Sequence, residues 1–202
     1  MKLYFAPGAC SLSPHIVLEE AGLEYTTEQV DLGKKVTASG QDFTAVNPKG
    51  YVPVLEMHGG AILTEGPAIV QYLADLAPDS RLAPPAGSAE RYQLMSMLNF
   101  ISTELHKNFG PLFNPEASAD MKAAARANLA KRYAYMAGLL AEQDYVCGAQ
   151  FSVADAYLFT VTNWTAKLGV DLSPWPAVQA FQARVGARPA VLRAMRAEGL
   201  IQ

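Results

Sequence analysis

Cys10 is placed where a thiol can be made reactive. It follows a short β-prone run and the break at Pro7-Gly8, and it stands just before or at the start of a predicted helix. The unpaired N–H groups and the dipole of a helix start favour an anion, so this position predicts a lowered thiol pKa. Ser11 offers a hydroxyl donor beside it. A small buried cysteine that only fills space is the alternative, but the strand–turn–helix position favours a functional role.

The residue three places after Cys10 limits what redox chemistry is available. Position 13 is a serine, so the motif is C-S-L-S rather than C-x-x-C. Without a resolving cysteine there, an internal dithiol cycle is excluded. Any redox reaction of Cys10 would need an external thiol.

Glu65-Gly66-Pro67 opens a second helix of interest, whose apolar stripe begins at Ile69. N–H groups at a helix start, flanked by a carboxylate, suit a ligand that has both an anionic and a cationic end. The alternative is an acidic cap that the helix dipole favours by itself. From this fragment in isolation, the cap is the favoured interpretation.

A polar stripe on a later helix is the third candidate. Asn99, Thr103 and His106 fall within a sector about 60° wide at about 100° per residue. Such a stripe could line a cleft, or it could be a solvated face. Phe109 and Phe113 come next, and they could wall an apolar pocket or belong to the core.

The elements that must position these residues change character along the chain. The first part reads as βαβ, a poorly regular stretch, and then ββα, with Pro53 at the entry of a strand, where its missing N–H is tolerated. Residues 78–88 are rich in proline and small polar residues and are typical of a linker. Beyond them the apolar residues recur every three or four positions, which predicts helices only. The predicted strands cover residues 2–5, 25–30, 52–57 and 61–64.

Composition excludes several classes of protein. Of the 202 residues 50% are hydrophobic and 17% charged, which is enough apolar material for a sizeable core. Sixteen Lys and Arg stand against 19 Asp and Glu, so neither nucleic acid nor an anionic membrane surface is an expected partner. The two cysteines and three histidines show no metal-ligand spacing. Two cysteines suit a reducing compartment, and the expectation is a soluble, cytoplasmic protein.

Taken together, these pieces resemble the glutathione S-transferases, and within them the bacterial beta class. The resemblance covers essentially the whole chain. It implies a thioredoxin-like α/β domain with a mixed βαβ-ββα sheet over residues 1–78, a linker over 79–88 and an all-α domain over 89–202. The segments that carry it are Tyr4–Ser11, Asn47–Leu55, Leu63–Ile69 and Ser152–Asp155.

The resemblance implies a glutathione site in the first domain. A cis proline at Pro53 would present the backbone of Val52 to the cysteine of glutathione, like an added strand. Glu65 and Gly66 would hold the γ-glutamyl end, and Lys35 would reach the glycine carboxylate. Many relatives carry serine where this chain has Gly66, so one hydroxyl donor is missing while the N–H remains.

The resemblance also assigns catalytic roles. Cys10 stands where other classes have the activating tyrosine or serine, with Ser11 as an assisting donor and His106 on the second-domain side. Phe109, Phe113 and Trp164 are the candidates for the electrophile pocket. The glutathione-binding set is completed by residues near the thiol and on the second domain, some of them acting across a dimer interface: Ala9, Asn99, Thr103, Glu104, Leu105 and Lys107.

The implied activity is transfer of glutathione, as co-substrate, to small hydrophobic electrophiles in a homodimer without a metal, extending to reductive dehalogenation of aromatic compounds. Lowering the pKa of the glutathione thiol by about two units needs about 2.7 kcal/mol. A helix N-terminus and one or two charge-assisted hydrogen bonds from Ser11 and His106 would be enough. The alternatives are a glutathione-dependent thiol–disulfide oxidoreductase that uses Cys10, resembling a monothiol glutaredoxin, and a non-catalytic glutathione-binding scaffold.

Overall fold

The computed structural model describes residues 1–202, and it divides into two compact units. Unit 1 contains Met1–Ala83 together with Ala187–Gln202, and unit 2 contains Pro84–Gly186. The sequence predicted a second domain that runs to residue 202. The structure instead groups the last sixteen residues, from Ala187 onward, with the N-terminal unit.

A five-stranded mixed sheet is the framework of unit 1. Its order is β3-β2-β1-β4-β5, with β1 parallel to β2 and the other neighbouring pairs antiparallel. This matches the predicted βαβ-ββα arrangement and adds one short edge strand. The strands are β1 (Lys2–Phe5), β2 (Thr26–Asp31), β3 (Val36–Thr37), β4 (Val54–Glu56) and β5 (Ile62–Thr64).

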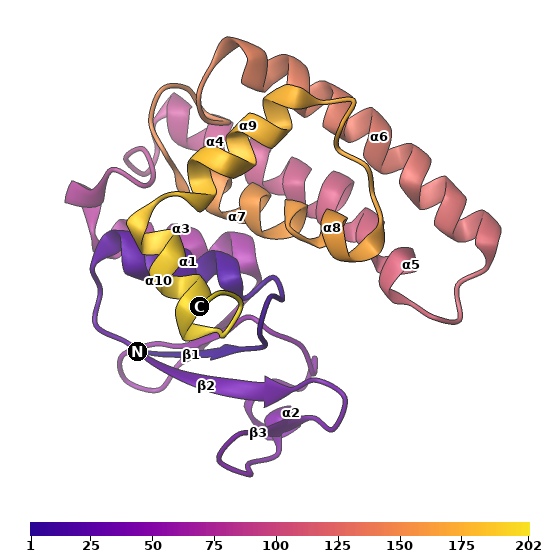
Figure 1. Cartoon of the computed structure of the whole chain (residues 1–202). Helices are drawn as coiled ribbons and strands as arrows, with labels where there is room; N and C mark the ends of the chain where they lie inside the picture. The colour runs from indigo at the N-terminus through magenta and orange to yellow at the C-terminus, as the bar shows by residue number, and fades with distance from the viewer. The chain divides into compact units, whose positions relative to one another are not determined.

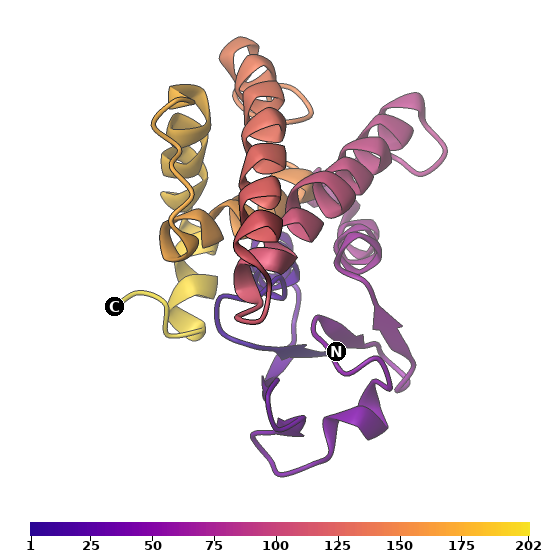
Figure 2. The same cartoon turned by 90° about the vertical axis from the view of Figure 1, so that its right-hand side faces the viewer.

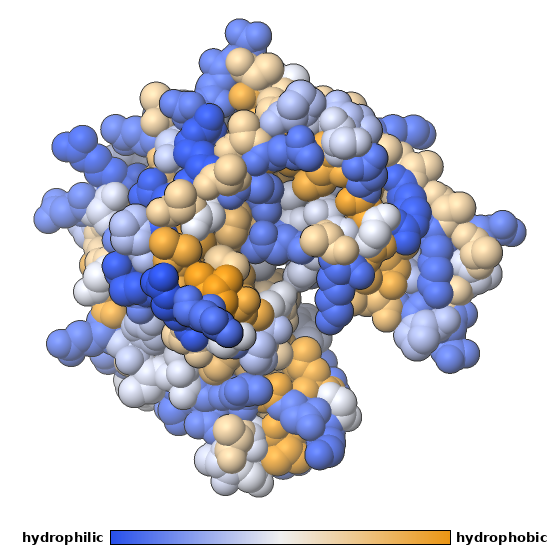
Figure 3. Space-filling model, viewed as in Figure 1, coloured by the Kyte–Doolittle hydropathy of each residue, from blue (hydrophilic) through white to orange (hydrophobic).

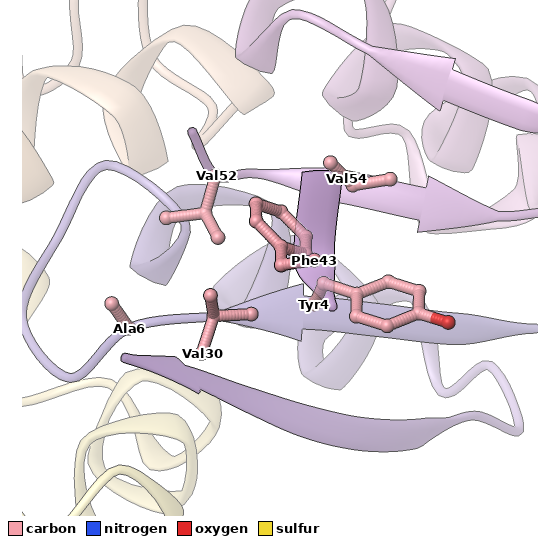
Figure 4. Packing of buried hydrophobic residues seen from close by; sticks show 6 residues of the cluster. All are labelled: Tyr4, Ala6, Val30, Phe43, Val52 and Val54. Atoms are coloured by element: carbon pink, nitrogen blue, oxygen red, sulfur yellow. The ribbon is translucent and has the colours of Figure 1, made fainter. Parts of the chain in front are cut away.

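Both faces of the central strands are covered. Side chains alternate along a strand, so Leu3 lies on one face and Tyr4 on the other, and both are buried. Tyr4 packs with Phe43 and Val54 in a cluster that also holds Val52 (Figure 4). Phe43 comes from α2 (Phe43–Val46), a single turn capped by Asp42. This turn and β3 lie in the stretch that the sequence left unassigned, because elements of two to four residues show no periodicity.

Three longer helices lie together above the strands of unit 1 (Figure 1). They are α1 (Leu12–Ala21), which ends at Gly22 in the left-handed region, α3 (Gly66–Leu76) and α10 (Pro189–Ala197). A short 3-10 turn, η1 (Pro78–Ser80), follows α3.

The packing of α10 on α1 explains why the end of the chain belongs to unit 1. Val191 and Ala194 are buried. The flanking arginines pair with the two glutamates near the end of α1, Arg188 with Glu20 and Arg193 with Glu19, each at 2.6 Å. The sequence shows α10 as a helix like those before it, and nothing local indicates which unit it joins.

Unit 2 is entirely helical, as predicted. The predicted apolar stripe Leu94, Leu98, Ile101 and Leu105 is buried, and α7 is buried along its whole length. The long helix α6 runs beside α9 (Figure 2). The helices are α4 (Ala89–Phe100), α5 (Gly110–Phe113), α6 (Ala119–Glu142), α7 (Val153–Thr162), α8 (Trp164–Leu168) and α9 (Pro176–Gly186).

The segment between α4 and α5 departs from a regular α-helix. A π-helical turn, η2 (Ile101–Leu105), is followed by a 3-10 turn, η3 (His106–Phe109). The sequence analysis placed Asn99, Thr103 and His106 in one sector by assuming a constant α-helical rotation. A π-helical turn is wider, so that assumption fails between Ile101 and Leu105. Single π-helical turns are rare and occur frequently at functional sites.

The surface in Figure 3 mixes hydrophilic and apolar residues. Hydrophilic residues are widespread on the face in Figure 3, and apolar residues form small patches. None of the helices is both long and apolar enough to cross a bilayer. No group of three His, Cys, Asp or Glu side chains is arranged to hold a metal ion.

Candidate active site

The thiol of Cys10 lies in the turn between β1 and α1 and is partly buried. Its Sγ donates a hydrogen bond to the carbonyl oxygen of Val52 at 3.3 Å. Burial raises the pKa of the Cys10 thiol to about 12, backbone N–H groups at the helix start oppose this rise, and the charges of Glu65 and Glu198 add to it. The predicted lowering of the pKa of the Cys10 thiol is therefore wrong, because desolvation outweighs the helix start. Cys10 is a neutral hydrogen-bond donor here.

Ser11 closes the turn that carries Cys10. Its fully buried hydroxyl donates to the carbonyl oxygen of Ala6 at 3.2 Å and accepts from the Ala6 N–H at 3.1 Å. The Ala9 N–H also donates to the carbonyl oxygen of Ala6, at 3.0 Å. The predicted assistance by Ser11 as a donor to a substrate is not what the structure shows, because the hydroxyl proton is already used inside the turn.

A buried carboxylate from the other end of the chain supports the same turn. Glu198 Oε2 accepts the N–H of Gly8 at 2.9 Å, and Oε1 lies 2.9 Å from His15 Nδ1. His15 Nε2 in turn lies 3.0 Å from the hydroxyl of Tyr25. Sequence reasoning missed Glu198, because a contact across 190 residues leaves no local signal.

The second wall of the candidate site is the segment that leads into β4. The Val52–Pro53 peptide bond is cis, as the resemblance implied. The Val52 side chain packs into the core (Figure 4). Its carbonyl oxygen accepts the hydrogen bond from the Cys10 thiol. Lys35 Nζ donates to the carbonyl of Gly50 at 2.7 Å. The structure thus brings Cys10, Lys35, Val52 and Pro53 together around one loop.

Glu65 and Gly66 join this group through the β4–β5 hairpin. The register pairs Val54 with Thr64, so the residues just before β4 lie beside those just after β5. A Cβ placed on Gly66 would lie 3.8 Å from Pro53 Cγ, which confirms the closeness. Glu65 precedes the first turn of α3 with φ of 73°, in the left-handed region that non-glycine residues rarely adopt.

Two residues that the sequence analysis did not select hold the Glu65 carboxylate. Lys49 Nζ lies 2.6 Å from Oε1, and the hydroxyl of Tyr51 donates to the same oxygen at 2.8 Å. The hydrogen bond with Glu65 raises the pKa of both Lys49 and Tyr51. The sequence predicted the two strands, over residues 52–57 and 61–64, but not their register, and it is the register that places residues before Val54 next to those after Thr64.

Unit 2 carries an aromatic cluster around His106. Its Nδ1 lies 2.6 Å from the hydroxyl of Tyr157, and its ring contacts that of Trp164 at 4.9 Å between centroids. Phe109 and Phe113 both stand edge-on to Trp164. The structure therefore groups the predicted pocket residues with His106, but Phe109 is fully buried and belongs to the core, whereas Phe113 is exposed. Tyr157, from the buried helix α7, is the member that the sequence analysis missed.

The remaining predicted contacts of unit 2 differ in exposure. Asn99, Thr103 and Lys107 are exposed, and the Thr103 hydroxyl donates to the Asn99 carbonyl at 3.1 Å. Glu104 pairs with Arg132 at 2.6 Å. Leu105 is fully buried, so its side chain belongs to the core.

Comparisons with known proteins identify the family. A model of the glutathione S-transferase N-terminal domain matches residues 8–76, and one of the C-terminal domain matches residues 100–189. The chain is 47% identical to glutathione S-transferase GstA of Escherichia coli O157:H7, over 99% of this chain and all of that one. The chain belongs to the glutathione S-transferase family.

Solved structures agree with this assignment. The ternary complex of BphK, described as a bacterial glutathione S-transferase, is 59% identical, with a TM-score of 0.98 over 98% of this chain and all of that one. A bacterial beta-class glutathione S-transferase from Sphingomonas chungbukensis is 44% identical, with a TM-score of 0.97 over the full length of both chains. The predicted family, class and fold are confirmed.

Proposed function

We propose that the protein binds glutathione on unit 1 and conjugates it, through its thiolate sulfur, to small hydrophobic electrophiles. The observation that carries this proposal is the hydrogen bond from the Cys10 thiol to Val52, the residue before the cis proline. It ties the predicted catalytic side chain to the backbone on which the cysteine of glutathione is expected to pair.

Each of the three residues of glutathione has matching groups on unit 1. The α-ammonium and α-carboxylate of the γ-glutamyl end suit the Glu65 carboxylate and the N–H groups at the start of α3. The cysteine suits the Val52 backbone, in the manner of an added strand. The glycine carboxylate suits Lys35, whose ammonium lies at Gly50 beside that strand.

Cys10 has a defined role in this arrangement. The N–H of the bound cysteine would donate to the Val52 carbonyl, the acceptor that Cys10 now uses. The Cys10 S–H is then available to donate to the glutathione sulfur, and a donor stabilises the thiolate over the thiol. Because the hydroxyl of Ser11 is used within its own turn, Cys10 takes over the part that the sequence analysis gave to Ser11.

We assign the electrophile to the aromatic cluster of unit 2. Phe113 offers an exposed apolar ring, Trp164 and the fully buried Phe109 pack behind it, and His106 and Lys107 offer donors to a leaving group or to charge that develops on the electrophile. Phe113 is the exposed member, at 45%. We include reductive dehalogenation in the proposal: the glutathione sulfur displaces halide from the arene, and a second thiol then attacks that sulfur, releasing the reduced arene and a disulfide.

Titration of bound glutathione tests the central step. Ultraviolet difference spectroscopy of the complex should show the thiol pKa fall from about 8.5 to about 6.5. The Cys10→Ala variant should return it part of the way, whereas Cys10→Ser, which keeps a donor, should remain close to the parent. A pKa in the parent complex equal to that of free glutathione contradicts the proposal.

The same variants separate conjugation from the redox alternative. Cys10→Ser should retain most conjugation of a chloronitrobenzene, and Cys10→Ala should lose about tenfold, in line with one charge-assisted hydrogen bond. If Cys10 itself exchanged with disulfides, both variants would lose turnover of a glutathione mixed disulfide. A chlorinated aromatic acid in the same panel tests dehalogenation. Glutathione binding with no turnover of any substrate would support the scaffold alternative.

We also propose a homodimer. Exposed apolar side chains on α4 and α6 support it: Tyr92 and Met95 on α4, and Met121 and Tyr135 on α6. The ring of Phe100 on α4 packs at a tilted angle against that of Tyr135, with 5.1 Å between ring centroids. Sedimentation equilibrium should give twice the chain mass, and a monomer at micromolar concentration would contradict this expectation.

A further inference from the structure

The Glu65 carboxylate is paired with a cation from its own chain. Lys49 Nζ donates to Glu65 Oε1 at 2.6 Å and to Thr64 Oγ1 at 3.0 Å. Tyr51 adds its hydroxyl at 2.8 Å, and its ring lies 5.9 Å from the Lys49 ammonium. All of these groups belong to unit 1, and the Lys49 and Glu65 side chains are about half exposed.

This arrangement matters because of what the ligand brings. In the proposed function, the Glu65 carboxylate receives the α-ammonium of the γ-glutamyl end. Lys49 places the same chemical group, a primary ammonium, on the same carboxylate. A ligand that carries an ammonium must therefore exchange one ion pair for another, whereas a ligand without one can leave the Lys49 pair intact.

We propose that Lys49 is a specificity-determining residue, an internal substitute for the ammonium of the γ-glutamyl end. This inference rests on the proposed glutathione function. Lys49 keeps Glu65 paired when no ammonium ligand is present and reduces the net gain when one arrives. Lys49 thereby lowers the discrimination between glutathione and analogues that lack the amino group.

The expected size of the effect follows from exposure. Exposed ion pairs are weak and are screened by salt. Removing the Lys49 charge should therefore tighten glutathione binding only about two- to fivefold at low ionic strength. The analogue without the amino group should bind no more tightly, because it would face a Glu65 carboxylate that has lost its cation.

The test compares two ligands and three proteins. Isothermal titration calorimetry under reducing conditions measures the Kd of glutathione and of glutaryl-cysteinyl-glycine, the same tripeptide without the α-amino group. The proteins are the parent, Lys49→Met, and the control Lys2→Met. Lys2 is also a partly exposed lysine in an ion pair, with Glu56 at 3.7 Å, and it lies at the opposite end of β1 from the Cys10 turn.

The ratio of the two Kd values decides the outcome. Lys49→Met should raise the preference for glutathione over the analogue at least twofold at low salt, and the rise should disappear at high salt. Lys2→Met should leave the ratio unchanged. Equal weakening of both ligands in Lys49→Met would show that Lys49 contacts the tripeptide carboxylate, and this would overturn the inference. An unchanged ratio would also overturn it.

The failure of the proposed function is recognised separately. A parent protein that binds neither ligand at millimolar concentration would overturn the glutathione function and the inference with it. A parent that binds glutathione, with a ratio insensitive to Lys49, would overturn the inference alone.

Discussion

Two helix starts of unit 1 carry the groups proposed to bind glutathione, and they treat their polar groups in opposite ways. At the start of α1, Cys10 and Ser11 are neutral donors, and Ser11 is fully buried with its hydrogen bonds made inside the protein. At the start of α3, Glu65 is exposed and charged, and its partners Lys49 and Tyr51 are also exposed. The start of α1 therefore presents buried, neutral groups whose hydrogen bonds are already made, whereas the start of α3 presents an exposed, charged group whose partners can be exchanged.

Burial explains the difference. Helix α1 directly follows the buried central strand β1 and packs against α10. Glu198, the residue after α10, places its carboxylate on the turn before α1. A buried thiol in that setting stays protonated, because the low dielectric penalises its charge. The α3 start follows the edge strand β5, where water screens charges and the ion pair can be exchanged. We therefore expect substitutions at the α1 end to change stability, and those at the α3 end to change binding.

Glu198→Ala should have the largest effect. It removes the acceptor of the Gly8 N–H and the buried partner of His15, and breaking such a pair costs about 3 kcal/mol of unfolding free energy. Urea denaturation measures this loss. The matched control is Glu24→Ala, an exposed carboxylate of the same unit, which should stay within about 0.5 kcal/mol of the parent. If the two variants were equally stable, the buried Glu198 would not stabilise the turn before α1, and the expected difference between the two helix starts would be wrong.

Glu65→Gln should show the reverse pattern. Glutamine keeps the size and shape of the side chain but carries no charge, so it cannot form an ion pair with the ammonium of the ligand. The Kd of glutathione should rise about 10- to 100-fold. The unfolding free energy should change by less than about 0.5 kcal/mol, because Lys49 and Tyr51 are exposed and can be hydrated. A large loss of stability with unchanged affinity would invert the comparison.

The features that could be predicted from the sequence were those set by neighbouring residues. Proline and glycine punctuation together with apolar spacing indicated the strands, the helices and the all-helical second part. The motifs indicated Cys10, Pro53 and Glu65. The environment of each group could not be read in the same way. Whether a helix start lowers or raises a thiol pKa depends on how deeply it is covered, and much of the cover comes from residues distant in the chain.

The missed residues show the same limit. Glu198 and Tyr157 act through contacts that span 190 and 51 residues. The π-helical turn before His106 also has no signal in the spacing of Leu98, Ile101 and Leu105, which suits a regular α-helix equally well. Lys49 meets Glu65 through the register of the β4–β5 hairpin, which the strand prediction did not set.

The rate of Cys10 alkylation tests whether the thiol at the start of α1 is protonated at neutral pH. A pKa raised from 9.0 to about 12 leaves about a thousandfold less thiolate at neutral pH. The greater nucleophilicity of a more basic thiolate offsets part of this loss, so alkylation should be roughly 50-fold slower than in the unfolded chain. Because the shift is upward, the rate should keep rising above pH 9, where the rate of the unfolded chain levels off.

Mass spectrometry of iodoacetamide-labelled peptides measures both rates, with the urea-unfolded protein as the reference. Cys147, whose pKa burial raises to about 11, is an internal comparison in the same sample. A Cys10 rate that levels off near pH 7 would mean that the α1 start does lower the thiol pKa, and the two helix starts would then be alike.

Gly66→Ser should have the smallest effect and should show how adjustable the charged start of α3 is. A Cβ at this position meets only Pro53 Cγ at 3.8 Å, an ordinary van der Waals distance, and the backbone there is compatible with other residues. The added hydroxyl can donate to the α-carboxylate of the ligand, and this should tighten glutathione binding about two- to fivefold. Gly66→Ala is the control, because it adds the Cβ without the donor and should leave the Kd unchanged. If both variants bind equally well, the gain comes from ordering the start of α3 rather than from the hydroxyl, and the α3 start would share the rigidity of the α1 start.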